Sequence, residues 1–222
     1  MSPTLQQVKI AELEKYGVEE LYHLTSIKNL AGILRDGILP QNVLRNNNCE
    51  FVDIANQGVQ ARRAQKALTH ENGVSLKIHD LVPLFFRTHT PMLFAIRARQ
   101  AELCFVCIEP SDMCADDLVC ILSDGNAASN ATRFFLFGES IEGAAKAIGE
   151  LPWRVINARY WHDHDDGGRR CSAEFLVSPS IRPSAFRRIL VQSASACLTV
   201  STIAENSSVG CEVSPRSFFL DD

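Results

Sequence analysis

The feature that most constrains the fold is the segment at residues 19–39, EELYHLTSIKNLAGILRDGIL. The pair Leu-Tyr at 21–22 is typical of a strand, and Thr25 or Ser26 can then cap a helix. Apolar residues follow at the spacing of one buried helical face, namely Ile27, Leu30, Ile33 and Leu34. Gly37 favours an end to the run. The segment predicts a short strand, a polar turn and an amphipathic helix.

Two polar residues of this segment are candidates for ligand binding. His23 and Thr25 are expected to leave the end of the strand beside the helix N-terminus. Free backbone N–H groups and the helix dipole favour an anionic or polar ligand there. The structural alternative is that the His23 imidazole only makes hydrogen bonds within the protein, beside a helix cap.

Composition indicates a globular protein. A chain of 222 residues with 46% hydrophobic and 22% charged residues can bury a full core, and we expect one domain over residues 1–222. The net charge is −4, so binding to nucleic acid would need a local basic face. No apolar run reaches membrane-spanning length and the N-terminus lacks a signal-peptide core, so we expect a cytoplasmic protein.

The eight cysteines are scattered and predict reduced, mostly buried thiols. Cys104 and Cys107 form a C-x-x-C, but on a strand this spacing points the side chains to opposite faces. We therefore assign both to the core.

The rest of the chain predicts alternating helices and strands. A weakly amphipathic helix is expected at 55–67, and two strands are expected at 81–86 and 92–96. Pro83 and Pro91 indicate that one or both of these strands lie at a sheet edge or begin there, and a buried strand is expected at 102–109. The other expected elements are a helix at 4–16, a strand at 118–123, one or two helices within 126–153, a strand at 173–177, and a strand, a short helix and a strand to the end.

Several short patterns could carry chemistry. Arg63 lies in a basic cluster that is either a solvated face or a guanidinium fork suited to a diphosphate. His79 and Asp80 could be a general-base pair or a local cap. The segment at 162–168, HDHDDGG, is expected to be a loop, and we predict no metal site there because no distant ligand completes a shell. Neither a phosphate loop nor a Rossmann glycine motif is present.

Glu174 is the most informative acid. In AEFLV, alternation places Ala173, Phe175 and Val177 on one face and Glu174 and Leu176 on the other. A carboxylate inside an apolar strand is costly unless it is paired, hydrogen-bonded or used. The pattern favours a functional role.

Four segments in register resemble one family. They are YHLTSIKNLAGILRDGIL, HDLVPLFFRTHTPMLFAI, SDGNAASNATRFF and RYWHDHDDGGRRCSAEFLV, and CEVSPRSFF is similar to the family's C-terminal strand. The chain resembles the DarT family of DNA ADP-ribosyltransferase toxins over nearly its whole length. The resemblance implies an α+β protein with the ADP-ribosyltransferase fold, a mixed split β-sheet core with flanking helices.

The resemblance also implies a reaction. NAD would be the co-substrate, and ADP-ribose would be attached to a base of single-stranded DNA, with thymine favoured and guanine possible. The family roles fall on His23 and Thr25 as NAD-binding residues, Asn29 as a support of that pocket, Arg63 as the functional arginine that also binds NAD, and Glu174 as the catalytic acid. A macrodomain antitoxin of the DarG type would be the partner.

The residues themselves add a candidate DNA track. The basic side chains proposed for phosphate contact are Arg62, Lys66, Arg169 and Arg170. The segment between Asn46 and His79 matches the family only through IANQGVQARR, and Phe218 and Phe219 replace a Trp and a Tyr. Two alternatives stay open: a transferase or 2′-phosphotransferase of the same fold acting on RNA or protein, and a catalytically silent binding module.

Overall fold

The computed structural model describes residues 3–69, 75–115, 117–138 and 140–219. Its helices are α1 (Leu5–Lys15), α2 (Leu30–Asp36), α3 (Gln41–Asn46), α4 (Gln57–Gln65), α5 (Pro91–Ala95), α6 (Ile141–Gly149), α7 (Trp153–Ile156), α8 (Gly167–Cys171) and α9 (Ala194–Ile203). Its strands are β1 (Leu21–Ser26), β2 (Ala67–Thr69), β3 (Ser75–Lys77), β4 (Val82–Phe85), β5 (Leu103–Ile108), β6 (Val119–Ser123), β7 (Phe134–Leu136), β8 (Glu174–Ser178), β9 (Phe186–Val191) and β10 (Gly210–Val213).

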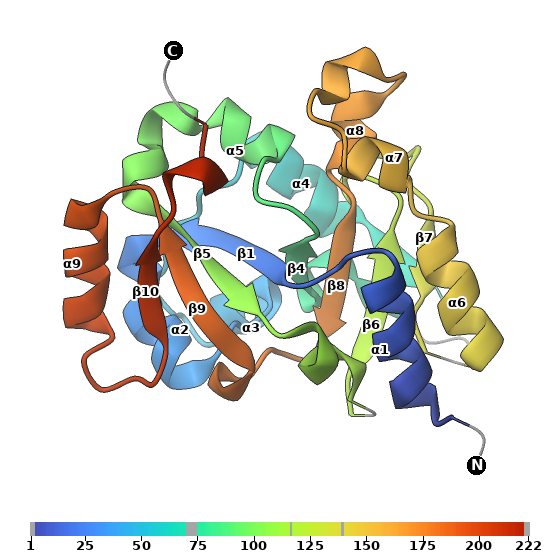
Figure 1. Cartoon of the computed structure of the whole chain (residues 1–222), viewed down its shortest axis with the longest axis horizontal. Helices are drawn as coiled ribbons and strands as arrows, with labels where there is room; N and C mark the ends of the chain where they lie inside the picture. Colours follow the sequence, from blue (N-terminus) through green and yellow to red (C-terminus); the bar gives the residue numbers. More distant parts are fainter. Residues whose placement is uncertain (1–2, 70–74, 116, 139, 220–222) are drawn as a thin grey trace.

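Eight strands form one mixed sheet in the order β10-β9-β5-β1-β4-β8-β6-β7, and β2 pairs with β3 in a separate hairpin. The β9–β10 pair is parallel, whereas the other neighbours in the large sheet are antiparallel. Figure 1 shows this sheet running through the centre of the molecule with helices around it. The predicted α+β class is confirmed.

The large sheet is split between β1 and β4. Strand β1 pairs with β5 over six residues, but its register with β4 consists of the single pair Tyr22 and Phe85. One half of the sheet therefore holds β10, β9, β5 and β1, and the other holds β4, β8, β6 and β7 (Figure 1). The mixed split sheet implied by the family resemblance is present.

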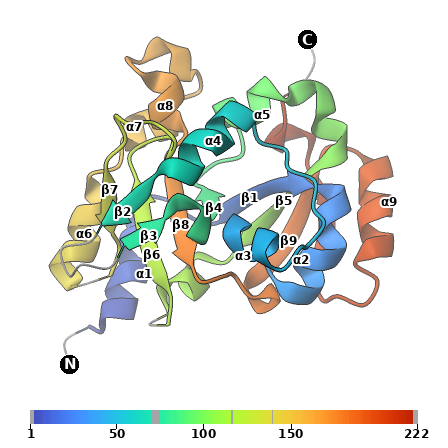
Figure 2. The ribbon, with the colours of Figure 1, turned by 180° about the vertical axis from the view of Figure 1, so that it is seen from behind.

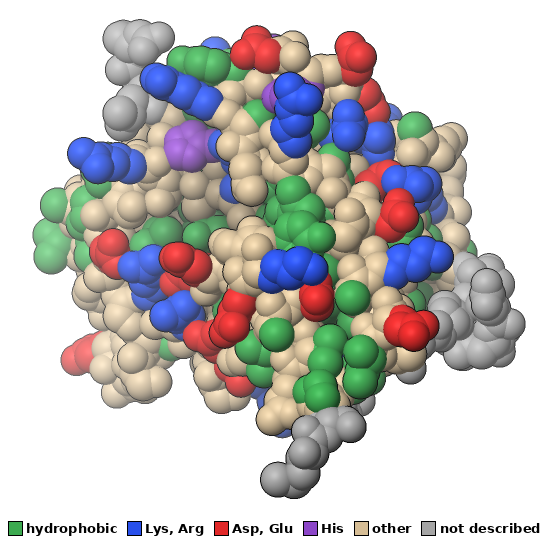
Figure 3. Space-filling model, turned by 45° about the vertical axis from the view of Figure 1, so that its right-hand side comes forward, with side chains coloured by type: hydrophobic (Ala, Val, Ile, Leu, Met, Phe, Trp, Pro, Cys, Tyr) green, Lys and Arg blue, Asp and Glu red, His purple; other side chains and the backbone are tan. Residues whose placement is uncertain are grey.

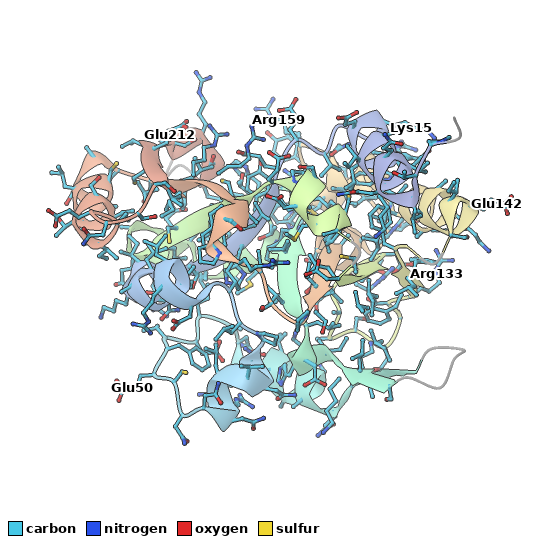
Figure 4. The ribbon with its side chains drawn as sticks, turned by 90° about the horizontal axis from the view of Figure 1, so that it is seen from below. Lys15, Glu50, Arg133, Glu142, Arg159 and Glu212 are labelled. Atoms are coloured by element: carbon cyan, nitrogen blue, oxygen red, sulfur yellow. The ribbon has the colours of Figure 1, made fainter. Side chains whose placement is uncertain are left out.

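Both faces of the sheet are covered. On one face the main core gathers buried residues of the sheet with those of α1, α6 and α9, among them Leu13, Ile148 and Val200. On the other face, α4 and the β2–β3 hairpin form a separate layer, seen in front in Figure 2 and below the sheet in Figure 4. Ile78 and Leu81 fasten this layer to β6 and β8 by packing with Ile121 and Leu176.

Several predicted elements are confirmed. Helix α1 begins with a capping box, in which Thr4 Oγ1 accepts the Gln7 N–H and Gln7 Oε1 accepts the Thr4 N–H. All six residues of β5 are buried, and Cys104 and Cys107 belong to cores on opposite faces. The C-terminal strand, helix and strand are β9, α9 and β10. All eight cysteines are free thiols and five of them are buried.

The strand predicted at 92–96 is wrong, because this segment forms the short helix α5. Thr90 Oγ1 accepts the Leu93 N–H, and Pro91 occupies the first helical position. This combination of cap and proline is a helix start signal, and it overrides the apolar run that suggested a strand. Pro83 is also not at an edge, since β4 lies between β1 and β8. The sparse β1–β4 pairing explains how a proline is accommodated inside the sheet.

Three further expectations near the site are wrong. The segment after β6 was expected to be helical before Gly138, but Phe134–Leu136 form the edge strand β7. The HDHDDGG segment is not all loop, because α8 begins at Gly167. In addition, β1 continues to Ser26, so His23 lies within the strand and not at its end.

Candidate active site

An arginine and a glutamate from distant parts of the chain form a buried ion pair. Arg63 lies in the last turn of α4 and Glu174 is the first residue of β8. Arg63 Nη1 lies 2.9 Å from each carboxylate oxygen of Glu174, and the two side chains are 11% and 3% exposed. Moving two charges out of water costs several kcal/mol per ion, so such a pair needs further hydrogen bonds or a chemical use.

The chain around β6 supplies those hydrogen bonds. The Ala127 N–H donates to Glu174 Oε1 at 2.8 Å, and Ser123 Oγ accepts the Glu174 N–H at 3.0 Å. A carboxylate offers about four lone-pair sites. Arg63 uses one site on each oxygen and Ala127 uses the second site on Oε1. Among the described residues no hydrogen bond occupies the remaining site, which is on Oε2.

A neutral histidine lies beside this pair. The Gln60 amide nitrogen donates to the Asp53 carboxylate, which leaves Gln60 Oε1 facing His79. Because an amide oxygen can only accept, His79 Nε2 is the donor in the 3.1 Å bond between them. Burial, assisted by the nearby Arg63 and Arg45, lowers the pKa of His79 to about 4. At neutral pH His79 therefore adds no charge to the Arg63–Glu174 pair. The partner of His79 is Gln60 and not Asp80, which accepts the Lys77 N–H, so the local-cap alternative holds for Asp80.

His23 spans the split in the sheet. Its Nδ1 lies 3.1 Å from the carbonyl oxygen of Pro83 on β4, and a carbonyl can only accept, so Nδ1 carries the proton. Burial lowers the pKa of His23, although the bond to Pro83 opposes this shift. The neutral ring is thereby fixed in one tautomer with Nε2 as an acceptor. Such a group suits a hydroxyl donor such as a ribose.

Asn29 connects β1 to the segment that leads into α4. Its Nδ2 donates to Thr25 Oγ1 and to the Val52 carbonyl, both at 3.0 Å, and its Oδ1 accepts the Val52 N–H at 2.8 Å. Both amide protons of Asn29 are thus used within the protein. Thr25 accepts one of them and keeps its own hydroxyl proton. This geometry suits Asn29 as a support and Thr25 as a donor.

The structure therefore arranges the predicted site residues as two groups. One is His23, Thr25 and Asn29 on β1 and the turn after it, and the other is Arg63 and Glu174. No hydrogen bond between residues of the described ranges joins the groups directly. They are linked through Asn29 and the chain from Val52 to α4.

The four residues of the predicted DNA track differ in their surroundings. Arg62 is exposed, whereas Lys66 donates to the carbonyl of Ser129 and lies over the Phe134 ring. Arg170 is half-buried and makes no ion pair with a residue that the structure describes. Arg169 is held by two carboxylates, those of Asp124 and Asp166. Figure 3 shows acidic and basic side chains interspersed over the face that brings α1 and α6 forward.

Two of the cavities in the described structure are polar, and neither is lined by Arg63 or Glu174. One of about 420 Å³ borders α4 and is lined in part by Arg45, Asp53 and Gln60. The other, of about 370 Å³, is lined in part by Asp124 and Arg169. Among the described residues no three His, Cys, Asp or Glu side chains are grouped to hold a metal ion, and this includes the HDHDD segment. No helix of the described chain is long and apolar enough to cross a membrane.

Sequence reasoning missed Ala127, Ser123 and Gln60 as parts of the site, and it considered His79 only as a partner of Asp80. Ala127 acts through its backbone, which carries no residue-specific signal. The SDGNAASNATRFF segment resembles the family, and this was the one available indication that the chain from Ser123 onward belongs to the site.

Curated relatives are similar over most of the chain. A DNA ADP-ribosyl transferase of Thermus sp. (strain 2.9) is 29% identical, over 78% of this chain and 81% of that protein. A DNA ADP-ribosyl transferase-DNA ADP-ribosyl glycohydrolase fusion protein of Thermosipho africanus is 24% identical over 90% of this chain. The match covers 50% of the fusion protein, so this chain spans about half the length of that relative.

Solved structures share the fold. Thermus sp. 2.9 DarT in complex with ADP-ribosylated ssDNA superimposes with a TM-score of 0.78 at 23% identity, covering 91% of this chain and 97% of that chain. The same Thermus protein in complex with NAD+ superimposes with a TM-score of 0.72, also at 23% identity, covering 91% and 98%. The family model described as "ssDNA thymidine ADP-ribosyltransferase, DarT" matches residues 22–219. With the split sheet and the Arg63–Glu174 pair in place, this match over nearly the whole chain shows that the protein belongs to the DarT family.

Proposed function

We propose that the protein is an NAD-dependent mono-ADP-ribosyltransferase that modifies thymine in single-stranded DNA, and that residues 1–222 act as one transferase domain. Family membership and the relatives' DNA ADP-ribosyl transferase activity support this reaction. Guanine is the second candidate base. NAD is consumed as a co-substrate, and no metal ion is required.

The reaction breaks the bond between nicotinamide and the ribose carbon and forms a bond from that carbon to a ring nitrogen of the base. Nicotinamide leaves as a neutral molecule, and the nitrogen loses its proton. Positive charge develops on the ribose in the transition state, so a carboxylate that is already in place stabilises it. Glu174 fits this need, because Oε2 keeps a lone pair for a ribose hydroxyl or for the proton of the base.

The other residues have roles that follow from their hydrogen bonds. His23 Nε2 and the Thr25 hydroxyl bind NAD, and Asn29 holds the Val52 backbone beside them. Arg63 holds the Glu174 carboxylate in position through Nη1, and its guanidinium also binds either the diphosphate or a carbonyl of the base. The exposed Arg62 and the half-buried Arg170 are the stronger candidates for phosphate contact along the DNA.

The buried Arg63–Glu174 pair is the observation that carries the proposal. A silent binding module has no need for a buried acid with an open lone pair, and replacing such a pair with apolar residues is often neutral or stabilising. An unpaired base also enters a pocket more readily than a stacked one, which favours single strands over duplex DNA.

Labelled NAD tests the proposal directly. The protein is incubated with NAD labelled in its ADP-ribose part and, separately, with single-stranded DNA, duplex DNA of the same sequence, RNA and a protein mixture. We expect label on single-stranded DNA that contains thymine, and none with Glu174→Ala. Oligonucleotides with thymine or guanine as the sole modifiable base identify the target. Label on RNA or protein but never on DNA would favour the first alternative, and an absence of transfer to every pool would favour the silent module.

The protein then acts as the toxin of a toxin–antitoxin pair. Bases carrying ADP-ribose in cytoplasmic DNA would block replication, and a macrodomain glycohydrolase of the DarG type would remove them. The fusion of transferase and glycohydrolase in the Thermosipho relative supports such a partner. We expect wild-type protein expressed alone to be toxic and Glu174→Ala to be tolerated, because turnover causes the damage. Equal toxicity of the two forms would point to binding or aggregation.

A further inference from the structure

The loop that holds Glu174 is itself fixed by an arginine of α8. Residues 124–133, which we call the 124–133 loop, connect β6 to β7. Arg169 Nη1 lies 2.9 Å from Asp124 Oδ1 at the start of the loop and 3.2 Å from Thr132 Oγ1 near its end. One guanidinium nitrogen thus bonds both ends of the loop.

The backbone of Arg169 also contacts the loop. The Asn126 N–H donates to the Arg169 carbonyl oxygen at 2.9 Å, and the next N–H along the chain, that of Ala127, donates to Glu174 Oε1. A Cβ on Gly125 would lie 2.8 Å from the Arg169 carbonyl oxygen, so only glycine allows this approach. Two hydrogen bonds from adjacent residues of the loop therefore link Arg169 to the Glu174 carboxylate.

The charges around Arg169 make a poor phosphate site. Its side chain is 16% exposed and lies between the carboxylates of Asp124 and Asp166. Asp124 is buried and also accepts bonds from the Arg133 backbone N–H and Nε, at 3.0 and 2.9 Å. Figure 4 places Arg133 at the outer edge of the molecule, beside α6. Burial alone would raise the pKa of Asp124, but its bonds to Arg133 and Arg169 lower it, so the acid stays ionised.

We propose that Arg169 and Asp124 are positioning residues for the transfer reaction: together they hold the 124–133 loop so that the Ala127 N–H orients Glu174, and Arg169 does not contact the DNA. This inference rests on the proposed role of Glu174. Displacing a catalytic group by about 1 Å can cost 10²-fold in rate, so the loop contributes to kcat without touching the substrate.

Kinetics of matched variants test the inference. Arg169→Gln and Asp124→Asn should each lower kcat by roughly 10- to 100-fold and leave the KM for single-stranded DNA unchanged. Combining them should cost little more than the worse single change, because both break one contact. Arg169→Lys should recover part of the loss. Arg170→Gln is the comparison, and it should weaken DNA binding several-fold and reduce the slope of affinity against salt by about one.

Opposite results would overturn the inference. If Arg169→Gln raises the KM for DNA and flattens the salt slope while Asp124→Asn has no effect, then Arg169 is a phosphate contact. Should the charge variants unfold at the assay temperature, Thr132→Val replaces them, with Thr132→Ser as the variant that keeps the hydroxyl. A loss of kcat in the valine variant alone supports the inference, and equal kcat values for the two contradict it.

An amide measurement separates this inference from the proposed function. If wild-type protein fails to modify DNA, the proposed function is wrong, but the NMR signal of the Ala127 amide still reports its bond to Glu174. Its proton should shift upfield and exchange faster in Arg169→Gln than in wild type. An unchanged amide would mean that Arg169 does not position Glu174.

Discussion

The two halves of the split sheet carry different kinds of functional groups. On β1 and the turn after it, the groups are neutral and close in sequence, since Thr25 and Asn29 are four residues apart. The charged pair lies at the β4–β8 half and is remote in sequence, since Arg63 comes from α4 and 111 residues separate it from Glu174 on β8. The members of the β1 group come from one continuous segment, although it also contacts Pro83 and Val52, whereas the charged pair forms only when α4 and β8 come together.

This difference suggests a division of labour. Neutral hydrogen-bonding groups such as the His23 imidazole and the Thr25 hydroxyl recognise a substrate at modest cost in desolvation. Buried charge is costly, and it is useful where charge develops during a reaction. We therefore expect changes on the β1 half to affect NAD binding and changes to the charged pair to affect turnover.

The largest expected effect is that of Glu174→Ala, which should lower transfer by at least about 10³-fold, because it removes the acid that stabilises the transition state. Initial rates with labelled NAD measure this. Glu174→Gln is the matched variant, since it keeps an oxygen for the Ala127 N–H and should fold while staying inactive. Near wild-type rates in either variant would place the chemistry elsewhere.

Arg63→Lys comes next, with an expected loss of about 10²-fold in kcat, because an ammonium cannot reproduce the planar set of donors that a guanidinium offers. Arg62→Lys is the control, since the neighbouring Arg62 is exposed. If Arg62→Lys is the damaging change and Arg63→Lys is silent, the assignment of the functional arginine is off by one position.

Asn29→Ala tests the β1 half. It removes three hydrogen bonds, two of which hold Val52, so we expect the KM for NAD to rise about tenfold with little change in kcat. The exposed Asn206→Ala is the control. A fall in kcat at unchanged KM would contradict the proposed division between binding and turnover.

The last expected effect is a pH dependence of stability and not of activity. His79 binds its proton with a pKa of about 4 when folded and about 6.5 when unfolded, so the unfolded chain takes up more protons between these values. The contribution of neutral His79 to the free energy of unfolding is fully present above pH 6.5 and is lost as the pH falls toward 4. The loss is at most about 3 kcal/mol. Denaturant unfolding from pH 7 to 4 measures it. His79→Gln should flatten the curve, whereas the exposed His162→Gln should leave it unchanged.

Sequence reasoning singled out Glu174, the proposed catalytic acid, but not its surroundings. Alternation along β8 placed Glu174 and Leu176 on the face opposite Phe175, and Phe175 and Leu176 do belong to different core clusters. The donor from Ala127 could not be predicted, because any residue type carries that N–H. The strand predicted at 92–96 is wrong for another reason. Thr90 and Pro91 form a helix start signal, and in this segment that signal outweighs the apolar run that favours a strand.

The contact between Gly125 and Arg169 also restricts how this protein can evolve. A side chain at position 125 would meet both the guanidinium and the carbonyl oxygen of Arg169, at 2.5 and 2.8 Å. Replacing the arginine would clear the first obstacle and leave the second, which belongs to the backbone of α8. A side chain at position 125 therefore requires a shift of the α8 backbone, so replacement of this glycine depends on changes elsewhere in the fold.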